Sequence, residues 1–170
     1  ETVKVRLKGE ASDRDFVKSI DYNARGQREE IVYGNNVSTD YTYDPETYRL
    51  LSVVSKKSNG VILQDLHYTY DPVGNIAQIF DGAFHTVFNH NDRIDPISKY
   101  IYDATYRLIE AIGREHEAMT ACHYQTNDKK HTEFIQLSDQ PINNGRALHN
   151  YEQFYQFDEN GNITQIRHIG

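Results

Sequence analysis

A short pattern that recurs five times along the 170-residue chain constrains its fold more than any other feature. Each copy reads aromatic residue, Asp or Asn, two or three further residues, Gly or Tyr, a polar residue and then usually Ile or Leu. The aromatic residues stand 21, 27, 32 and 55 residues apart, which indicates a unit of about twenty residues with inserted loops of variable length. The copies are YNARGQR (22–28), YDPETYRL (43–50), YDPVGNI (70–76), YDATYRL (102–108) and FDENGNI (157–163).

The segment LHYTYDPVGNIAQIF at 66–80 illustrates what one copy encodes. Apolar and polar residues alternate up to Tyr70, as in a strand with one packed face. Asp71 can then accept hydrogen bonds from backbone amides two residues on, and Gly74 tolerates a positive φ. The apolar pattern resumes at Ile76, so each copy predicts a β-hairpin.

The aromatic, acidic and glycine positions of the copies form the predicted structural turn motif. In the first copy Asn23 and Gly26 take the places of the aspartate and the glycine. Tyr48 and Tyr106 occupy the glycine position, and we expect their two turns to differ in geometry from the glycine turns. The residues of the motif are Tyr43, Asp44, Tyr70, Asp71, Gly74, Tyr102, Asp103, Asp158 and Gly161.

The fold predicted from this pattern is all-β and antiparallel, with roughly 10 to 14 strands of the usual length. A second hairpin signal lies at 30–37. The best helix candidate is 104–118, but Gly113 interrupts it and strand alternation fits at least as well. Residues 119–145 read as an irregular insertion. We expect 1–170 to be a single repeat segment cut from a larger chain, whose exposed strand edges would need neighbours.

Composition and charge exclude several classes of function. The net charge is −7 and the basic residues are scattered, which argues against nucleic-acid binding. The single cysteine, Cys122, excludes a disulfide framework and a cysteine-based zinc cluster. No run approaches the ~18 apolar residues of a membrane span, and the first ten residues lack the apolar stretch of a signal peptide.

The chain offers no convincing catalytic, cofactor or metal site, and we expect no enzyme activity and no cofactor. Asp65 and His67 are too close in sequence to chelate if neighbours on a strand point to opposite faces. Cys122 and His123 are adjacent, whereas a Cys–His dyad normally comes from distant segments. The turn aspartates each have a local acceptor role. No metal motif links His85, His90, His116, His123, His131 or His149.

The repeats resemble those of the RHS/YD-repeat family, and in particular the RHS region of the SpvB-related B component of bacterial ABC-type insecticidal toxin complexes. The similar stretches are FVKSIDYNARGQREEIVYGN (16–35), YTYDP (41–45), ILQDLHYTYDPVGNI (62–76), YIYDATYRLIEAIGREH (100–116) and YQFDENGNITQI (155–166). Residues 119–145 depart from the pattern, and the chain contains neither a β-propeller nor a ring-closing protease segment of the kind found in C components.

The resemblance implies a hairpin ribbon that spirals into a hollow β-shell, or cocoon, around a toxic polypeptide. It implies as partners the rest of the same shell and a C-component-like protein with its toxin cargo, and a secreted or extracellular location as part of the complex. An alternative is a cell-surface adhesion or carbohydrate-binding module. That alternative would require several tyrosine rings to be exposed and coplanar, whereas packing explains most of them first.

Overall fold

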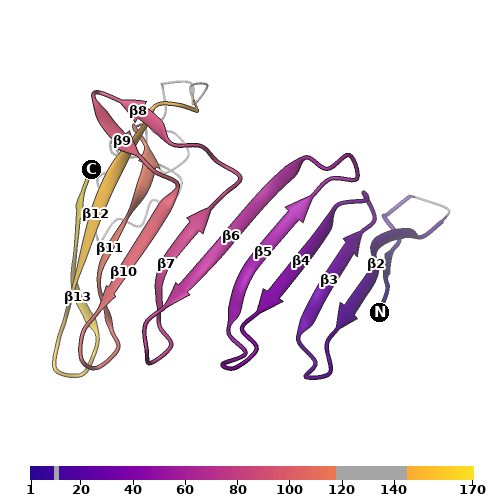
Figure 1. Cartoon of the computed structure of the whole chain (residues 1–170), viewed down its shortest axis with the longest axis horizontal. Coiled ribbons are helices and arrows are strands. Elements are labelled where there is room, and N and C mark those ends of the chain that lie inside the picture. Colours follow the sequence, from indigo (N-terminus) through magenta and orange to yellow (C-terminus); the bar gives the residue numbers. More distant parts are fainter. Residues whose placement is uncertain (10–11, 118–144) are drawn as a thin grey trace. The chain divides into compact units, whose positions relative to one another are not determined.

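The computed structural model describes residues 1–9, 12–117 and 145–170. All thirteen elements described there are β-strands (Figure 1), which confirms the predicted all-β antiparallel fold. The segment considered as a helix forms strand β11, Leu108–His116. Apart from Gly145, the insertion predicted at 119–145 lies outside the described residues. So do Cys122, His123 and His131.

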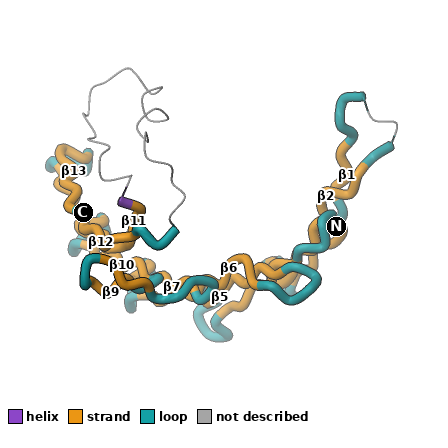
Figure 2. The backbone as a smooth tube through the Cα atoms, turned by 90° about the horizontal axis from the view of Figure 1, so that it is seen from above, coloured by secondary structure: helices purple, strands orange, loops and turns teal. Residues whose placement is uncertain are grey.

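The chain divides into two compact units, of which the first comprises Glu1–Tyr70 and Ile79–Phe84. Its first six strands pair in chain order, each antiparallel to the next, and lie in one layer (Figure 2). They are β1 (Val3–Val5), β2 (Arg14–Tyr22), β3 (Arg28–Tyr33), β4 (Ser38–Tyr43), β5 (Leu50–Lys56) and β6 (Ile62–Tyr70).

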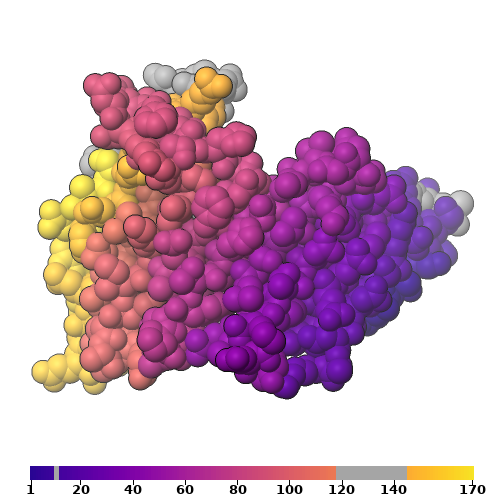
Figure 3. Space-filling view, in the orientation of Figure 1, coloured from indigo at the N-terminus to yellow at the C-terminus, as the bar shows by residue number. Residues whose placement is uncertain are grey.

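The two faces of this layer differ in character because side chains alternate along each strand. On one face Ile31 pairs with Ile20 and Thr39, and all three lie in one row across the sheet. Ile31 and Thr39 are 4% and 5% exposed. On the other face Glu30 pairs with Asp21 and Asp40, so carboxylates lie directly opposite one another. In the space-filling view, no further layer covers these strands on the face shown (Figure 3).

The second unit comprises Asp71–Gln78 and His85–Gly170, so that β7 (Ile76–Asp81) has its first half in this unit and its second half in the other. Its main strands again pair antiparallel in chain order. They are β10 (Ile97–Tyr102), β11 (Leu108–His116), β12 (Leu148–Phe157) and β13 (Ile163–Ile169). The exposed strand β13 has three isoleucines that are 41% to 54% exposed.

A short hairpin, β8 (Val87–Asn89) and β9 (Asp92–Ile94), contacts β12 in the second unit. This packing buries Ile94 completely. Asn150 on β12 donates its side-chain amide to the Arg93 carbonyl over 3.1 Å, which fixes the hairpin on the strand. Few other residues are as well covered. Ile31, Val53, Ile94 and Ala111 are the buried hydrophobic residues among those described.

Candidate functional site

Four of the five sequence copies close into the same turn. The amide of the opening residue donates to the carbonyl four residues later, and the amide three residues on donates back to the opening carbonyl. The Asp44 copy has one extra residue, and its two hydrogen bonds accordingly reach Arg49 and come from Tyr48. The opening residues of the four matching turns are Asn23, Asp71, Asp103 and Asp158.

The opening carboxylate organises the turn by accepting several hydrogen bonds. Oδ1 of Asp71 accepts from the amides of Val73, Gly74 and Asn75 at 3.1, 2.7 and 2.8 Å. Its Oδ2 accepts from Nδ2 of Asn75 at 2.9 Å. Both oxygens are therefore engaged within the turn, where they satisfy amides that the strand ladder does not reach.

The residue that closes each of these turns also contributes its side chain, a role that the sequence analysis did not assign. The pattern contained the signal, because this position is polar in every copy. The side-chain pairs are Gln27 with Asn23, Asn75 with Asp71, Arg107 with Asp103 and Asn162 with Asp158, at 2.7 to 3.0 Å.

These hydrogen bonds favour the ionised form of the turn carboxylates. Burial raises the pKa of Asp71, but the hydrogen bonds from Asn75 and its neighbours outweigh it, so the net change is a lowering. The Thr105 hydroxyl and the Arg107 amide hold the pKa of Asp103 well below its usual range. Hydrogen bonds of the same kind lower the pKa values of Asp44, first from Thr47, and of Asp158, first from Asn162.

The expected difference between tyrosine and glycine turns is wrong for Tyr106. The Asp103 turn has the same two backbone hydrogen bonds as the Asp71 turn, and Tyr106 adopts φ 64° where Gly74 has 110°. A bulky side chain in this left-handed region is strained. The hydrogen bonds around Asp103 hold the backbone there despite that strain. Tyr48 has φ 60° too, but in the longer turn.

The hairpins of four motif copies have a β-bulge next to the turn, on the returning strand. A bulge disrupts the ladder locally and re-aims the groups beside it. Neither the bulges nor their consequence could be seen in the sequence pattern. The register shifts lie at Asp21/Tyr22, Thr42/Tyr43, Ile101/Tyr102 and Gln156/Phe157.

The motif tyrosines connect consecutive copies. Each hydroxyl donates to the carbonyl of the residue that follows the preceding turn, so Tyr and Asp of the motif have different roles. The aspartate builds its own turn, whereas the tyrosine contacts the turn before it. The hydrogen bonds are Tyr43 to Arg28 at 3.0 Å, Tyr70 to Leu50 at 2.7 Å and Tyr102 to Ile76 at 3.1 Å.

Arginines add a second kind of contact between copies. The Arg49 guanidinium lies 5.6 Å from the centre of the Tyr70 ring, and that of Arg107 lies 4.9 Å from the Phe157 ring. Cations within about 6 Å of a ring centre are attracted by it. Phe157 has no hydroxyl, so the Asp158 copy has an arginine contact in place of the tyrosine hydrogen bond.

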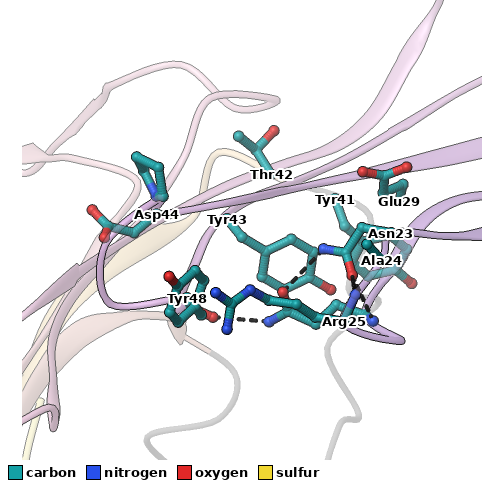
Figure 4. A pocket seen from close by; sticks show the side chains of 11 residues that line it. Asn23, Ala24, Arg25, Glu29, Tyr41, Thr42, Tyr43, Asp44 and Tyr48 are labelled. Carbon is teal, nitrogen blue, oxygen red and sulfur yellow. Dashed lines mark hydrogen bonds between the residues drawn. The ribbon is translucent and has the colours of Figure 1, made fainter.

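A cavity of about 420 Å³ lies between the turns of the first two motif copies, and Figure 4 shows the side chains that line it. The Arg25 guanidinium lies 3.2 Å from the centre of the Tyr48 ring. Nε2 of Gln27 donates to the Tyr48 carbonyl over 2.9 Å. The walls are thus made of the same turn residues that hold the copies together, and Tyr43 lines the cavity beside them.

Three of the other candidate histidines, His67, His90 and His149, lie close to carboxylates. The prediction that Asp65 and His67 point to opposite faces is wrong, since residues two apart on a strand share a face, and their side chains lie 2.9 Å apart. Nε2 of His90 is 3.1 Å from Glu117. Among the described residues, no group of three His, Cys, Asp or Glu could hold a metal ion.

A cluster on the last three strands of the second unit was not predicted from the sequence. Nε2 of His149 and Nε2 of His168 both lie within hydrogen-bond distance of Oε1 of Glu115, at 2.9 and 2.7 Å. His168 also stacks on Tyr151, with ring centres 5.3 Å apart. Tyr151 in turn covers Gly113, where any Cβ would come within 2.9 Å of the ring. The registers of β11 with β12 and of β12 with β13 bring these residues together.

No family model matches the chain. Two curated relatives, toxin subunits YenC1 and YenC2 of Yersinia entomophaga, are 38% and 36% identical over 167 residues, or 95% of this chain. The chain spans 16% of the length of these relatives. Their names carry the letter C, whereas the resemblance found in the sequence was to the B component. No helix in the described part of the chain is long and apolar enough to cross a membrane.

Solved structures of TcdB2-TccC3 contain a closely similar region. The crystal structure of TcdB2-TccC3-Cdc42 aligns with a TM-score of 0.72 and 35% identity, covering 99% of this chain and 7% of that one. The crystal structure of TcdB2-TccC3 aligns with a TM-score of 0.70 and 34% identity, covering 98% and 8%. With the repeated aspartate turns and the all-β fold, these similarities identify the chain as a segment belonging to the RHS/YD-repeat family of bacterial toxin-complex subunits.

Proposed function

We propose that residues 1–170 are one structural segment of an RHS-repeat shell that encloses a toxic polypeptide in a bacterial toxin complex. The segment forms part of the wall of the shell and performs no chemistry of its own. Its partners are the rest of the same shell and a C-component-like polypeptide with its cargo. The complex acts outside the producing cell.

The observation that carries this proposal is the single-layer construction of the first unit. Six strands form one layer, with one face of aliphatic, hydroxyl and tyrosine side chains and one face with opposed carboxylates. Ile31 and Val53 are its only buried hydrophobic residues among those described. Such a layer has little core of its own, which suits a wall better than an independent domain.

The adhesion alternative has less support. Of the described tyrosines, Tyr22, Tyr48 and Tyr106 are the exposed ones, at 40% to 59%. Tyr48 and Tyr106 lie in turns, and Tyr48 is covered on one side by Arg25. The described tyrosines therefore offer no flat row of exposed rings for stacking on sugars, whereas Tyr43, Tyr70 and Tyr102 contact preceding turns through their hydroxyls.

A segment exchange tests the proposal in a complete toxin complex. The matching 167 residues of YenC1 are replaced by this chain, and the chimera is assembled with its natural partner subunits. We expect a closed complex in which an enclosed polypeptide resists added protease. The matched control carries the same exchange with Asp71→Ala and Asp103→Ala, which should weaken the wall and the protection. An assembled, folded chimera that leaves the enclosed polypeptide fully digestible would contradict the shell role.

A further inference from the structure

The contact between the Asp103 turn and Phe157 can be compared directly with the other contacts between copies. Extending the strand register by a few residues places Phe157 beside Arg107, as it places Tyr43 beside Gln27 and Tyr70 beside Arg49. In each case the aromatic residue lies next to the residue that closes the preceding turn. The backbone arrangement is therefore the same, and only the side chains differ.

At Phe157 the usual hydrogen bond cannot form. By equivalence with Leu50, which accepts from Tyr70, the acceptor for Phe157 would be the carbonyl of Leu108. A phenyl ring has no donor to offer it. The ring instead faces the guanidinium of Arg107, which lies 4.9 Å from its centre.

Arg107 makes two electrostatic contacts at the same time. Its Nε lies 2.7 Å from Oδ2 of Asp103, and its guanidinium faces the Phe157 ring. The Arg107 side chain is 37% exposed and that of Asp103 is 21% exposed. Charges this close to water are screened by salt, while a neutral hydroxyl-to-carbonyl hydrogen bond is not.

We propose that Arg107 is a positioning residue that makes the Phe157 contact dependent on ionic strength, whereas the Tyr102 contact one copy earlier is not. The Tyr102 contact is the appropriate reference because Asn75, a neutral residue, closes the turn before it. This is a regulatory property beyond the shell function, since it makes the contact between these two copies weaken as salt rises. The loosening would begin at the turn ends of β11 and β12.

Amide hydrogen exchange in the assembled protein tests the proposal. Raising NaCl from about 50 mM to about 500 mM should accelerate exchange around Leu108–Glu110 by roughly two- to fivefold, the range expected for loss of an exposed cation–ring contact. Exchange around Ile76–Gln78 should not change. Equal acceleration in both regions would overturn the proposal, because it would indicate a general effect of salt on the sheet.

Three variants separate the ring contact from the Asp103 contact. Arg107→Met should accelerate exchange at low salt and remove the salt dependence. In a Phe157→Leu background the same change should have a much smaller effect. If Arg107→Met has the same effect in both backgrounds, Arg107 acts through Asp103 alone and the proposal fails. Phe157→Tyr adds only a hydroxyl group to the ring, so it should supply the missing donor and reduce the salt response. An unchanged salt response in this variant would also contradict the proposal.

Discussion

The Tyr70 contact of the first unit and the Phe157 contact of the second differ by one hydroxyl group. In both, an arginine closes the preceding turn and lies over the ring, at 5.6 Å for Arg49 and 4.9 Å for Arg107. Tyr70 adds a 2.7 Å hydrogen bond to the Leu50 carbonyl. In both copies the aromatic ring lies beside the preceding turn, and either a hydrogen bond or a cation can hold it there.

The largest difference between the two contacts should appear when the ring is removed. Tyr70→Ala should lower the free energy of unfolding by about 3 kcal/mol, at the low end for large-to-small aromatic changes because the ring is only half-buried. Phe157→Ala should cost less, since no hydrogen bond is lost with it. Chemical denaturation of both variants measures the difference. Equal losses would show that the hydroxyl contributes nothing.

Removing only the hydroxyl isolates the hydrogen bond. Tyr70→Phe should cost about 1 kcal/mol, the usual net value of one intramolecular hydrogen bond, and turns the Tyr70 contact into the Phe157 type. The exposed Tyr106 provides the control, because Tyr106→Phe should change stability by less than about 0.5 kcal/mol. Thermal or denaturant unfolding measures both variants. If Tyr70→Phe and Tyr106→Phe have the same stability, the Tyr70 hydroxyl does not distinguish the two contacts.

The turns that precede the two contacts also differ in how they tolerate a tyrosine at positive φ. Tyr106 is exposed, so Tyr106→Gly should relieve strain and stabilise the protein by up to about 1 kcal/mol. Tyr48→Gly relieves the same strain but loses the contact with Arg25 at 3.2 Å, so its net effect should be near zero. A loss of stability with Tyr106→Gly would mean that its ring packs more than its exposure indicates.

The smallest effect should be the response of the two turns to acid. The pKa values of Asp44 and Asp103 are lowered in the folded protein, so their contribution is fully present above the unfolded value of about 4. It is lost as the pH falls through the folded pKa. Unfolding measured from pH 5 downward should therefore show a shallower decline for Asp103→Asn than for the unaltered protein. An identical decline would assign the acid sensitivity to other carboxylates.

The sequence was informative about several features that a single hairpin decides. The Asp71 turn, the alternation that leaves Tyr68 and Tyr70 less exposed than His67 and Thr69, and the strand content all follow from local chemistry. The target of the Tyr70 hydroxyl could not be predicted, because Leu50 lies 20 residues away and its position depends on a bulge.

Other features depend on the pairing of distant strands or on backbone strain. In the Glu115 cluster, His149 and His168 lie 34 and 53 residues away from Glu115 along the chain, and no spacing rule connects residues so far apart. Asp65 and His67 are a different case, because period-2 alternation already places them on one face and the sequence reasoning applied it incorrectly. Tyr106 could not be assigned a positive φ from propensity, because the hydrogen bonds of Asp103 override the preference of the residue.

The backward direction of the tyrosine contact has a consequence for how such a chain can lengthen during evolution. The donor and acceptor are 15, 20 and 26 residues apart at Tyr43, Tyr70 and Tyr102, and the longest interval contains the β8–β9 hairpin. Only the turn end of each hairpin takes part in the contact. New segments can therefore be inserted at the opposite end of the strands without disturbing it, so duplication and insertion can enlarge the wall one hairpin at a time.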